Sequence, residues 1–262
     1  MVSAQGKTVI VTGAAGGLGK AIADGFLAAG ANVVVCDINP QRIAVVEEGW
    51  KATYAGKFLT QQTDVTDETA VQKLFDFALA KFGRVDVLVN NAGIMDDFGP
   101  VGTCSKELWD RVLNINLNGP YLTSKIAVNL FEKQEPVGGL IINIGSNASA
   151  YGFKSGVAYT VSKAGVMALT KNTAGFYGPK GIYSIALLLG GMDGTNITDA
   201  FATGIHTEMF QQVSKSQTPY EPGKTTVPLA SVAKYCVFLS DDDIAPNANG
   251  SCIFFNKNWP EA

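Results

Sequence analysis

Tyr159 and Lys163, four residues apart, have the types and the spacing needed for proton transfer. Residues at positions i and i+4 lie on one face of a helix, so the phenol and the ammonium can approach each other there. A free tyrosine has a pKa near 10, and a positive charge about 4 Å away at an effective dielectric near 20 contributes about 4 kcal/mol, roughly three pKa units. We therefore expect Lys163 to bring the pKa of Tyr159 toward physiological pH, where a phenol can act as a general acid or base. The alternative is an ordinary Tyr and Lys pair on a helix surface.

A glycine-rich stretch follows the first apolar run of the chain. It reads Thr12-Gly13-Ala14-Ala15-Gly16-Gly17-Leu18-Gly19 and leads into a segment in which Leu18, Ile22 and Phe26 recur at helical spacing. Glycines let the backbone turn sharply and let a pyrophosphate approach the amino end of the helix, where free N–H groups and the helix dipole stabilise its charge. Strand, turn and helix in this order predict a dinucleotide site, with a plain tight turn as the alternative.

Asp37 ends the second expected strand, 18 residues past Gly19. A carboxylate at this place can accept hydrogen bonds from the adenosine ribose hydroxyls, and it repels a 2′-phosphate. No Lys or Arg stands between Lys20 and Arg42, so this segment offers no obvious partner for such a phosphate. The sequence therefore favours NAD over NADP, although Asp37 can also be a turn-former before Asn39-Pro40.

The spacing Thr12-Gly13-xxx-Gly17-x-Gly19 resembles that of the short-chain dehydrogenase/reductase family. Further matches extend along nearly the whole chain and come in the family's order: Asp64-Val65, Asn90-Asn91-Ala92-Gly93, Asn116 within Asn114-Ile115-Asn116-Leu117-Asn118-Gly119, Ser146, and Tyr159-xxx-Lys163.

The resemblance implies a role for each matched residue. Ser146 holds the substrate oxygen, Tyr159 exchanges its proton as hydride moves to or from C4 of the nicotinamide, and Lys163 hydrogen-bonds the nicotinamide ribose. Asn116 completes the implied catalytic set by holding a water that connects Lys163 to solvent. The expected cofactor contacts are Gly13, Gly17, Leu18, Gly19, Asp37, Asp64, Val65, Asn91, Ala92, Gly93, Tyr159, Lys163, Met192 and Thr195.

Apolar runs rich in β-branched residues alternate with helix-period segments along the chain. This alternation is typical of βαβ units around a parallel sheet that is buried on both faces. We expect one doubly wound, Rossmann-type α/β domain over residues 1–262, with helices on both faces of seven parallel strands. The apolar residues from Val71 to Phe82 recur at helical spacing and predict an amphipathic helix, with Thr66 as its N-cap and Asp67 and Glu68 in its first turn. The expected strands are Thr8–Val11, Asn32–Cys36, Lys57–Gln61, Val85–Val89, Leu140–Ile144, Ile182–Leu189 and Ser251–Phe255.

The stretch 190–228 is too long for an ordinary connection, whose median length is about 4–6 residues, and it is rich in Gly and Pro. We expect it to form a mobile substrate lid, with His206 on its surface. The substrate is expected to be a secondary alcohol or its ketone in a partly apolar pocket. The apolar candidates, which could equally seal the core or a subunit interface, are Phe98, Tyr151, Phe153, Met192, Phe201, Met209 and Phe210.

Two places depart from the family pattern. Leu189-Gly190 stands where the family usually has Pro-Gly, at the start of the loop over the nicotinamide, which brings Met192 and Thr195 into question as cofactor contacts. Phe255–Trp259 stands where an Asp-Gly-Gly turn is common, in a region that often packs at a subunit interface. The family resemblance still implies a homo-oligomer, a tetramer or a dimer.

Composition narrows the remaining possibilities. A net charge of −3 gives no basic field for nucleic acid, and a single histidine leaves little for metal catalysis, so we expect neither nucleic acid nor metal. Four scattered cysteines without a CxxC pair indicate free thiols. With no apolar signal core or membrane-length run, we expect a cytoplasmic protein that does not bind membranes.

These patterns together predict an NAD(H)-dependent oxidoreductase that interconverts a secondary alcohol and a ketone. Two alternatives stay open. One is an NADP-linked carbonyl reductase of the same fold, and the other is a dinucleotide-binding sensor, scaffold or non-redox catalyst that has lost its redox activity.

Overall fold

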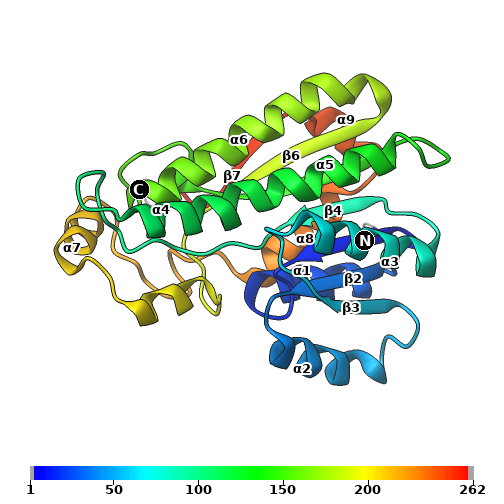
Figure 1. Cartoon of the computed structure of the whole chain (residues 1–262), viewed down its shortest axis with the longest axis horizontal. Helices are drawn as coiled ribbons and strands as arrows, with labels where there is room; N and C mark the ends of the chain where they lie inside the picture. Colours follow the sequence, from blue (N-terminus) through cyan, green and yellow to red (C-terminus); the bar gives the residue numbers. More distant parts are fainter. Residues whose placement is uncertain (1–2, 259–262) are drawn as a thin grey trace.

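Short runs of β-branched and other apolar residues form seven parallel strands of one sheet (Figure 1). The computed structural model describes residues 3–258. The strand order is β3-β2-β1-β4-β5-β6-β7, so the chain reverses its direction across the sheet between β1 and β4. Every strand expected from the sequence is present, with ends that differ by at most two residues. The strands are β1 (Thr8–Thr12), β2 (Asn32–Asp37), β3 (Phe58–Gln62), β4 (Val87–Asn90), β5 (Gly139–Ser146), β6 (Ile182–Leu189) and β7 (Cys252–Phe255).

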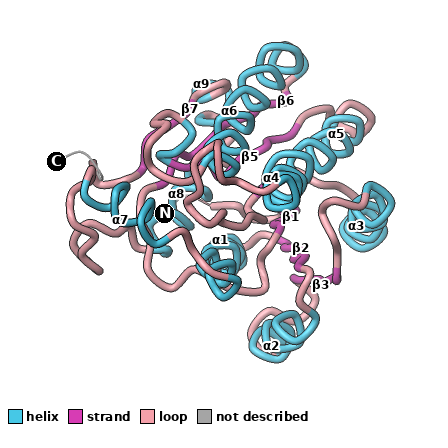
Figure 2. Tube along the Cα trace, turned by 60° about the vertical axis from the view of Figure 1, so that its left-hand side comes forward, coloured by secondary structure: helices cyan, strands magenta, loops and turns pink. Residues whose placement is uncertain are grey.

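Helices cover both faces of the sheet, because alternate side chains of each strand point to opposite faces and both sets are apolar. Helices α1, α2 and α8 pack on one face, while α3 and α5 pack on the other; Figure 2 shows α1 and α3 on opposite sides of β1 to β3. The helices are α1 (Gly17–Ala28), α2 (Pro40–Lys51), α3 (Glu68–Phe82), α4 (Lys106–Leu113), α5 (Gly119–Phe131), α6 (Val157–Tyr177), α7 (Thr207–Lys215), α8 (Leu229–Leu239) and α9 (Ile244–Ala248). None in the described part of the chain has both the length and the apolar character needed to span a membrane.

The amino end of α3 differs from the sequence expectation. The N-cap is Asp67, whose carboxylate accepts hydrogen bonds from the backbone N–H groups of Thr69 and Ala70 at 2.8 and 3.3 Å. The expected N-cap, Thr66, is wrong by one residue. Its hydroxyl instead donates to Asp64 at 2.7 Å, which leaves the next side chain to cap the helix.

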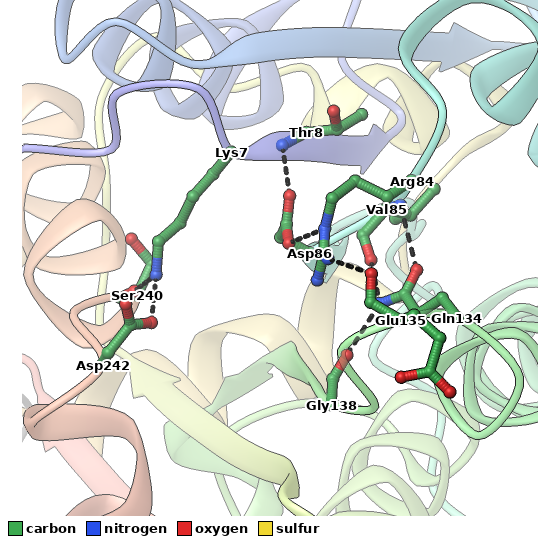
Figure 3. Close-up of polar contacts among 10 residues, drawn as sticks. All are labelled: Lys7, Thr8, Arg84, Val85, Asp86, Gln134, Glu135, Gly138, Ser240 and Asp242. Carbon is green, nitrogen blue, oxygen red and sulfur yellow. Dashed lines mark hydrogen bonds and ion pairs between the residues drawn. The ribbon is translucent and has the colours of Figure 1, made fainter.

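Polar contacts tie the amino ends of the central strands together (Figure 3). Asp86, just before β4, accepts hydrogen bonds from the backbone N–H of Thr8 at 2.8 Å and from Arg84 at 2.6 Å. Lys7 reaches the turn after α8, where it pairs with Asp242 at 2.5 Å. These contacts hold β1 and β4 in place at the edge of the sheet opposite to their carboxyl ends.

The 190–228 segment contains a 3-10 helix, Ile197–Thr203, and α7, which lies at one end of the molecule (Figure 1). The Asp193 carboxylate accepts hydrogen bonds from the hydroxyls of Tyr220 and Thr226, both at 2.6 Å. Because Asp193 lies near the start of the segment and Thr226 near its end, the two ends are joined at their base.

Candidate active site

A cavity of about 970 Å³ lies at the carboxyl ends of the central strands. This is where ligands bind in open α/β sheets, at the point where the strand order reverses. Of the residues predicted to be in the site, all but Asn116 line this cavity. They are Gly13, Gly17, Leu18, Gly19, Asp37, Asp64, Val65, Asn91, Ala92, Gly93, Ser146, Tyr159, Lys163, Met192 and Thr195.

The glycine turn after β1 is locked to the turn after β4. Gly13 has a φ of +60°, and a Cβ at this position would lie 2.8 Å from Cα of Ala92, so only glycine fits without displacing the backbone. The hydroxyl of Thr12 accepts hydrogen bonds from the backbone N–H groups of Asn91 and Ala92, both at 3.0 Å. The Asn91 side-chain amide donates to the Thr12 and Gly13 carbonyls at 2.9 and 3.0 Å. The two turns therefore form one rigid floor for the cavity.

Asp37 is buried at the carboxyl end of β2 and also lines the cavity. One carboxylate oxygen accepts a hydrogen bond from the backbone N–H of Ala15 at 3.1 Å, and the other accepts one from Asn39 at 3.0 Å. Asp37 thus fixes the glycine turn and initiates the turn before α2. An ionised carboxylate has about four acceptor positions, so both oxygens can still accept from a ligand.

Arg42, which the sequence argument placed beyond the site, lines the cavity as well. Its guanidinium does not point freely into it, because it forms an ion pair with Asp199 of the 190–228 segment at 2.5 Å. This pair links α2 to that segment across the cavity.

Ser146, Tyr159 and Lys163 come together where β5 ends and α6 begins. The Ser146 hydroxyl accepts a hydrogen bond from the backbone N–H of Ala148 at 3.2 Å and lies close enough to the Tyr159 phenol to lower its pKa. Lys163 is buried, donates from Nζ to the Ile144 carbonyl at 2.9 Å, and has Nζ 5.7 Å from the centre of the Tyr159 ring. One turn of α6 therefore places the phenol and the ammonium side by side, as the i and i+4 spacing predicts.

The pKa of Tyr159 moves in the opposite direction to the sequence expectation. The pKa is raised from 10.0 to about 12, mainly by burial. Ser146 lowers this pKa by hydrogen bonding, and the charge of Asp96 raises it. Burial also lowers the pKa of Lys163 from 10.5 to about 8. The expectation failed because it counted only the attraction of the Lys163 charge and left out burial, and loss of water disfavours both the phenolate and the ammonium.

Asn116 does not line the cavity; it is fully buried behind it, in a short π-helix, Asn114–Asn118, between α4 and α5. Its side chain accepts a hydrogen bond from the backbone N–H of Ile94 and donates to the Ile94 carbonyl, both at 2.9 Å. It also donates to Ser162 at 3.2 Å. These contacts join the loop after β4 to α6, one residue before Lys163.

The apolar pocket expected from the sequence is only partly correct. Phe98, Met192 and Phe210 line the cavity, whereas Tyr151 packs on Phe254 and Phe153 is exposed. Phe201 and Met209 do not line it either; Phe201 packs on the ring of Phe98 at 5.8 Å. His206, expected on the surface, is half-buried beside a second cavity of about 440 Å³.

Met192 and Thr195, the two cofactor contacts that Leu189 brings into question, line the cavity. Leu189 pairs with Ser146 and Phe255 as the last residue of β6, and Asn256 packs against the following Gly190. Asn256 also donates to Asn147 at 3.0 Å, so the atypical carboxyl-terminal stretch supports the loop beside the cavity. Trp259 lies outside the described residues.

Sequence reasoning missed several residues that line the cavity, notably Arg111, Lys154, Gln217 and Tyr220. They come from α4, the loop before α6 and the 190–228 segment, where no motif or period marks a residue as facing the site. Asp96, which contacts the amino end of α6, was missed as well.

The cavity combines a glycine turn after β1, an acidic residue at the end of β2 and a Ser–Tyr–Lys cluster. These features define a dinucleotide-dependent oxidoreductase of the Rossmann type. Residues 7–205 match the family model described as short chain dehydrogenase. The chain belongs to the short-chain dehydrogenase/reductase family. It is 46% identical over 255 residues to the short chain dehydrogenase/reductase dpchG of Colletotrichum higginsianum, covering 97% of this chain and 94% of that protein.

A more distant relative is 3beta-hydroxysteroid dehydrogenase 2 of Eggerthella lenta, which is 32% identical over 254 residues, covering 97% of this chain and 95% of that protein. Among solved structures, levodione reductase superposes with a TM-score of 0.85 at 25% identity, covering 97% of each chain. The chain is therefore similar over nearly its whole length to proteins named as dehydrogenases and reductases.

Proposed function

We propose that this protein is an NAD(H)-dependent oxidoreductase that interconverts a secondary alcohol and a ketone. The observation that carries the proposal is the convergence of Ser146, Tyr159 and Lys163 at the end of a cavity whose other end is the glycine turn and Asp37. The Ser–Tyr–Lys set suits proton transfer to or from a substrate oxygen. The glycine turn and Asp37 suit a dinucleotide whose adenosine ribose carries no 2′-phosphate.

The residues present fit a dinucleotide. Gly17 has a φ of +52° and lies at the amino end of α1, where a Cβ would approach Asn196 to 3.1 Å and narrow the cavity. The free N–H groups of that helix end suit a pyrophosphate. Asp37 would accept hydrogen bonds from the adenosine ribose, and the Lys163 ammonium, which uses one proton on Ile144, retains two for the other ribose. When bound, the nicotinamide supplies the hydride acceptor or donor.

The protein's own residues then handle the proton. Ser146 and Tyr159 line the same cavity with their hydroxyls near each other, so a substrate oxygen can bond to both. In the oxidative direction the Tyr159 phenolate accepts the hydroxyl proton of the alcohol, and in reduction the Tyr159 phenol gives its proton to the ketone oxygen. Lys163 stabilises the phenolate from the same face of α6.

Two features support a bulky, partly apolar substrate. Phe98, Met192 and Phe210 line the cavity, and one relative is named as a 3β-hydroxysteroid dehydrogenase, whose name describes a secondary alcohol on a rigid ring system. We propose an alicyclic secondary alcohol or the matching ketone as substrate, with the 190–228 segment as its lid.

Replacement of the Tyr159 hydroxyl tests the proposed chemistry. Tyr159→Phe should reduce kcat by at least about a hundredfold, the lower end of what a general acid or base contributes, while the Kd for NADH stays within about twofold. Steady-state kinetics on alicyclic alcohols and fluorescence titration with NADH measure the two quantities. Tyr177→Phe, at the far end of the same helix, is the matched control. Wild-type kcat in Tyr159→Phe would exclude Tyr159 as the proton donor.

One observation supports the NADP-linked alternative: Arg42, whose charge suits a 2′-phosphate, borders the cavity near Gly16. Asp37→Ala decides between the two cofactors. If Asp37 selects against the 2′-phosphate, the variant narrows a wild-type preference for NADH by about tenfold or more, equal to about 1.4 kcal/mol. Parallel titrations with NADH and NADPH at one fixed salt concentration measure this ratio, and an unchanged ratio removes Asp37 from the explanation.

We also propose that the protein is cytoplasmic and a homotetramer or homodimer. All four cysteines lie in the described part of the chain and are free, which suits a reducing compartment. The oligomer follows from the family resemblance, and light scattering after gel filtration would measure it.

A further inference from the structure

Asp96 lies in the loop after β4 and has a buried side chain, exposed by only 3%. Its carboxylate accepts four hydrogen bonds, three from backbone N–H groups and one from a hydroxyl. One oxygen accepts from Phe98 and Gly156, both at 3.1 Å, and from the Ser155 hydroxyl at 3.2 Å. The other accepts from the backbone N–H of Tyr159 at 2.9 Å. Burial raises the pKa of Asp96, and the four hydrogen bonds, all from donors, act against that rise by favouring the ionised carboxylate, which only accepts.

These contacts make Asp96 the cap of α6. The first backbone N–H groups of a helix have no partner within the helix, and a side chain at the N-cap normally satisfies one of them. The N-cap of α6 is Gly156, which has no side chain, so Asp96 supplies the acceptor from 60 residues earlier in the sequence. Its negative charge also suits the positive end of the helix dipole.

Gly156 is the residue that makes room for this carboxylate. A Cβ at Gly156 would lie 2.5 Å from one oxygen of Asp96 and 2.6 Å from the other. Gly156 has a φ of −70°, which any residue can adopt, so its lack of a side chain matters here for space. The carboxylate therefore packs flat against the backbone of the turn that carries Tyr159.

We propose that Asp96 is a positioning residue for the proposed reaction: it fixes the first turn of α6, and so the direction of the Tyr159 phenol toward Ser146. After burial, its charge is a further cause that raises the pKa of the phenol. This inference rests on the proposed function, since it concerns the same tyrosine. The same loop carries Phe98, whose ring packs on Phe210 at 5.0 Å, so Asp96 also anchors the loop that meets the 190–228 segment.

Several other charged or titratable groups surround this pair. Lys163 faces Tyr159 from α6, and Cys104 lies close enough to Asp96 and Asp97 for both charges to raise its pKa. Asp97, Arg111 and His206 line the second cavity together with Asp96. Asp96 differs from these neighbours in that its carboxylate bonds directly to the backbone of Tyr159 and its charge raises the pKa of the phenol.

Two variants separate the geometry from the charge. Asp96→Asn keeps the shape but removes the charge and, because an amide group replaces one oxygen, leaves an N–H donor without an acceptor. Gly156→Ala keeps the charge but displaces the carboxylate from the turn. Asp97→Asn is the matched control, because it removes the charge next to Asp96. The Asp97 side chain accepts a hydrogen bond from the backbone N–H of Gly99 and not from α6.

We expect both test variants to lower kcat by at least about tenfold, with the Kd for NADH within about twofold of wild type. The Tyr159 amide hydrogen should exchange at least about tenfold faster in both. Only Asp96→Asn should move the pH dependence of alcohol oxidation, shifting the rise in rate to lower pH by about half a unit to one unit, because the phenolate no longer faces a negative charge. Asp97→Asn should leave exchange, kcat and pH profile at wild-type values.

Wild-type kcat and pH profile in a folded Asp96→Asn would overturn the proposal. Loss of activity in proportion to a fall in Tm, with no shift of the pH profile, would overturn it too, since it indicates a purely structural role. Should Asp96→Asn fail to fold, Gly156→Ala decides: native exchange at Tyr159 with native kcat refutes the positioning role. Amide exchange needs no substrate, so it tests Asp96 even if the wild-type protein oxidises no alcohol, an outcome that would count against the proposed function alone.

Discussion

At the scale of single residues, burial outweighs charge in the Tyr159 and Lys163 pair. The i and i+4 spacing correctly places both side chains on one face of α6, because that depends only on helix geometry. The direction of the pKa shifts depends on the surrounding protein, which removes water from both groups. A local sequence pattern contains no information on that burial. The shared helix face could therefore be predicted from the sequence, and the direction of the pKa shifts could not.

The lowered pKa of Lys163 has a consequence for stability. The folded chain binds the Lys163 proton less tightly than the unfolded chain, with a pKa of about 8 against 10.5. Between these values the unfolded state holds more of this proton, so Lys163 by itself makes the free energy of unfolding rise with pH in this window, by about 3 kcal/mol in all. The thiols of Cys36 and Cys236, whose pKa burial raises from 9.0 to about 12, lower the free energy of unfolding above pH 9 in wild type and variant alike. Lys163→Met should lack that rise.

Denaturant unfolding of the cofactor-free protein at intervals from pH 7 to pH 10 measures this difference. The quantity to compare is the difference between wild type and Lys163→Met, because the raised pKa values of Cys36, Cys236 and Tyr159 destabilise the folded state of both proteins at high pH. Lys171→Met, an exposed lysine on the same helix, should follow the wild-type curve. If the free energy of unfolding changed with pH in the same way in wild type and Lys163→Met, the lowered pKa of Lys163 in the folded protein would be wrong.

At the scale of secondary-structure elements, local patterns identify strands and motifs but not the contacts between distant segments. The β-branched runs place all seven strands, and the glycine turn follows β1 as expected. The cap of α6 by Asp96 and the ion pair of Arg42 with Asp199 join residues 60 and 157 positions apart. Such contacts depend on how the loops fold over the sheet, which no periodicity describes.

The ion pair between α2 and the 190–228 segment yields a prediction about cofactor choice. Asp199→Asn should free the Arg42 guanidinium, which can then bind a 2′-phosphate with two hydrogen bonds, and raise NADPH affinity relative to NADH by about threefold or more. The side chains of Arg42 and Asp199 are 38% and 56% exposed, so the free energy of unfolding should change by less than about 1 kcal/mol.

Parallel NADH and NADPH titrations of the variant measure the ratio. Asp242→Asn is the matched control, since its ion pair with Lys7 has the same length of 2.5 Å and lies at the amino end of β1, away from the cavity (Figure 3). An unchanged ratio in Asp199→Asn would show that Arg42 does not reach the 2′ position.

At the scale of the whole molecule, the cavity is built from both halves of the sheet. Residues after β1 and β2 form one end, those after β5 and on α6 form the other, and the 190–228 segment borders both. Two hydrophobic cores, one on each face of the sheet, each extend across both halves. A ligand that contacts Gly17, Asp37 and Lys163 together therefore links α1 and β2, in one half of the sheet, to α6, which packs on β5 and β6 in the other half.

Cofactor binding should for this reason stabilise the whole fold. NADH at about 100 times its Kd adds about 2.7 kcal/mol to the free energy of unfolding. For a chain of this size, about 2–4 °C in Tm per kcal/mol predicts a rise of roughly 5–10 °C. Thermal unfolding followed by circular dichroism measures it, and NADPH at the same concentration should give a smaller rise if Asp37 selects the cofactor. Tyr159→Phe should retain the full rise, because the phenyl ring that lines the cavity is kept and only the hydroxyl proposed for proton transfer is lost. If neither cofactor changed Tm at millimolar concentration, the cavity would not be a dinucleotide site.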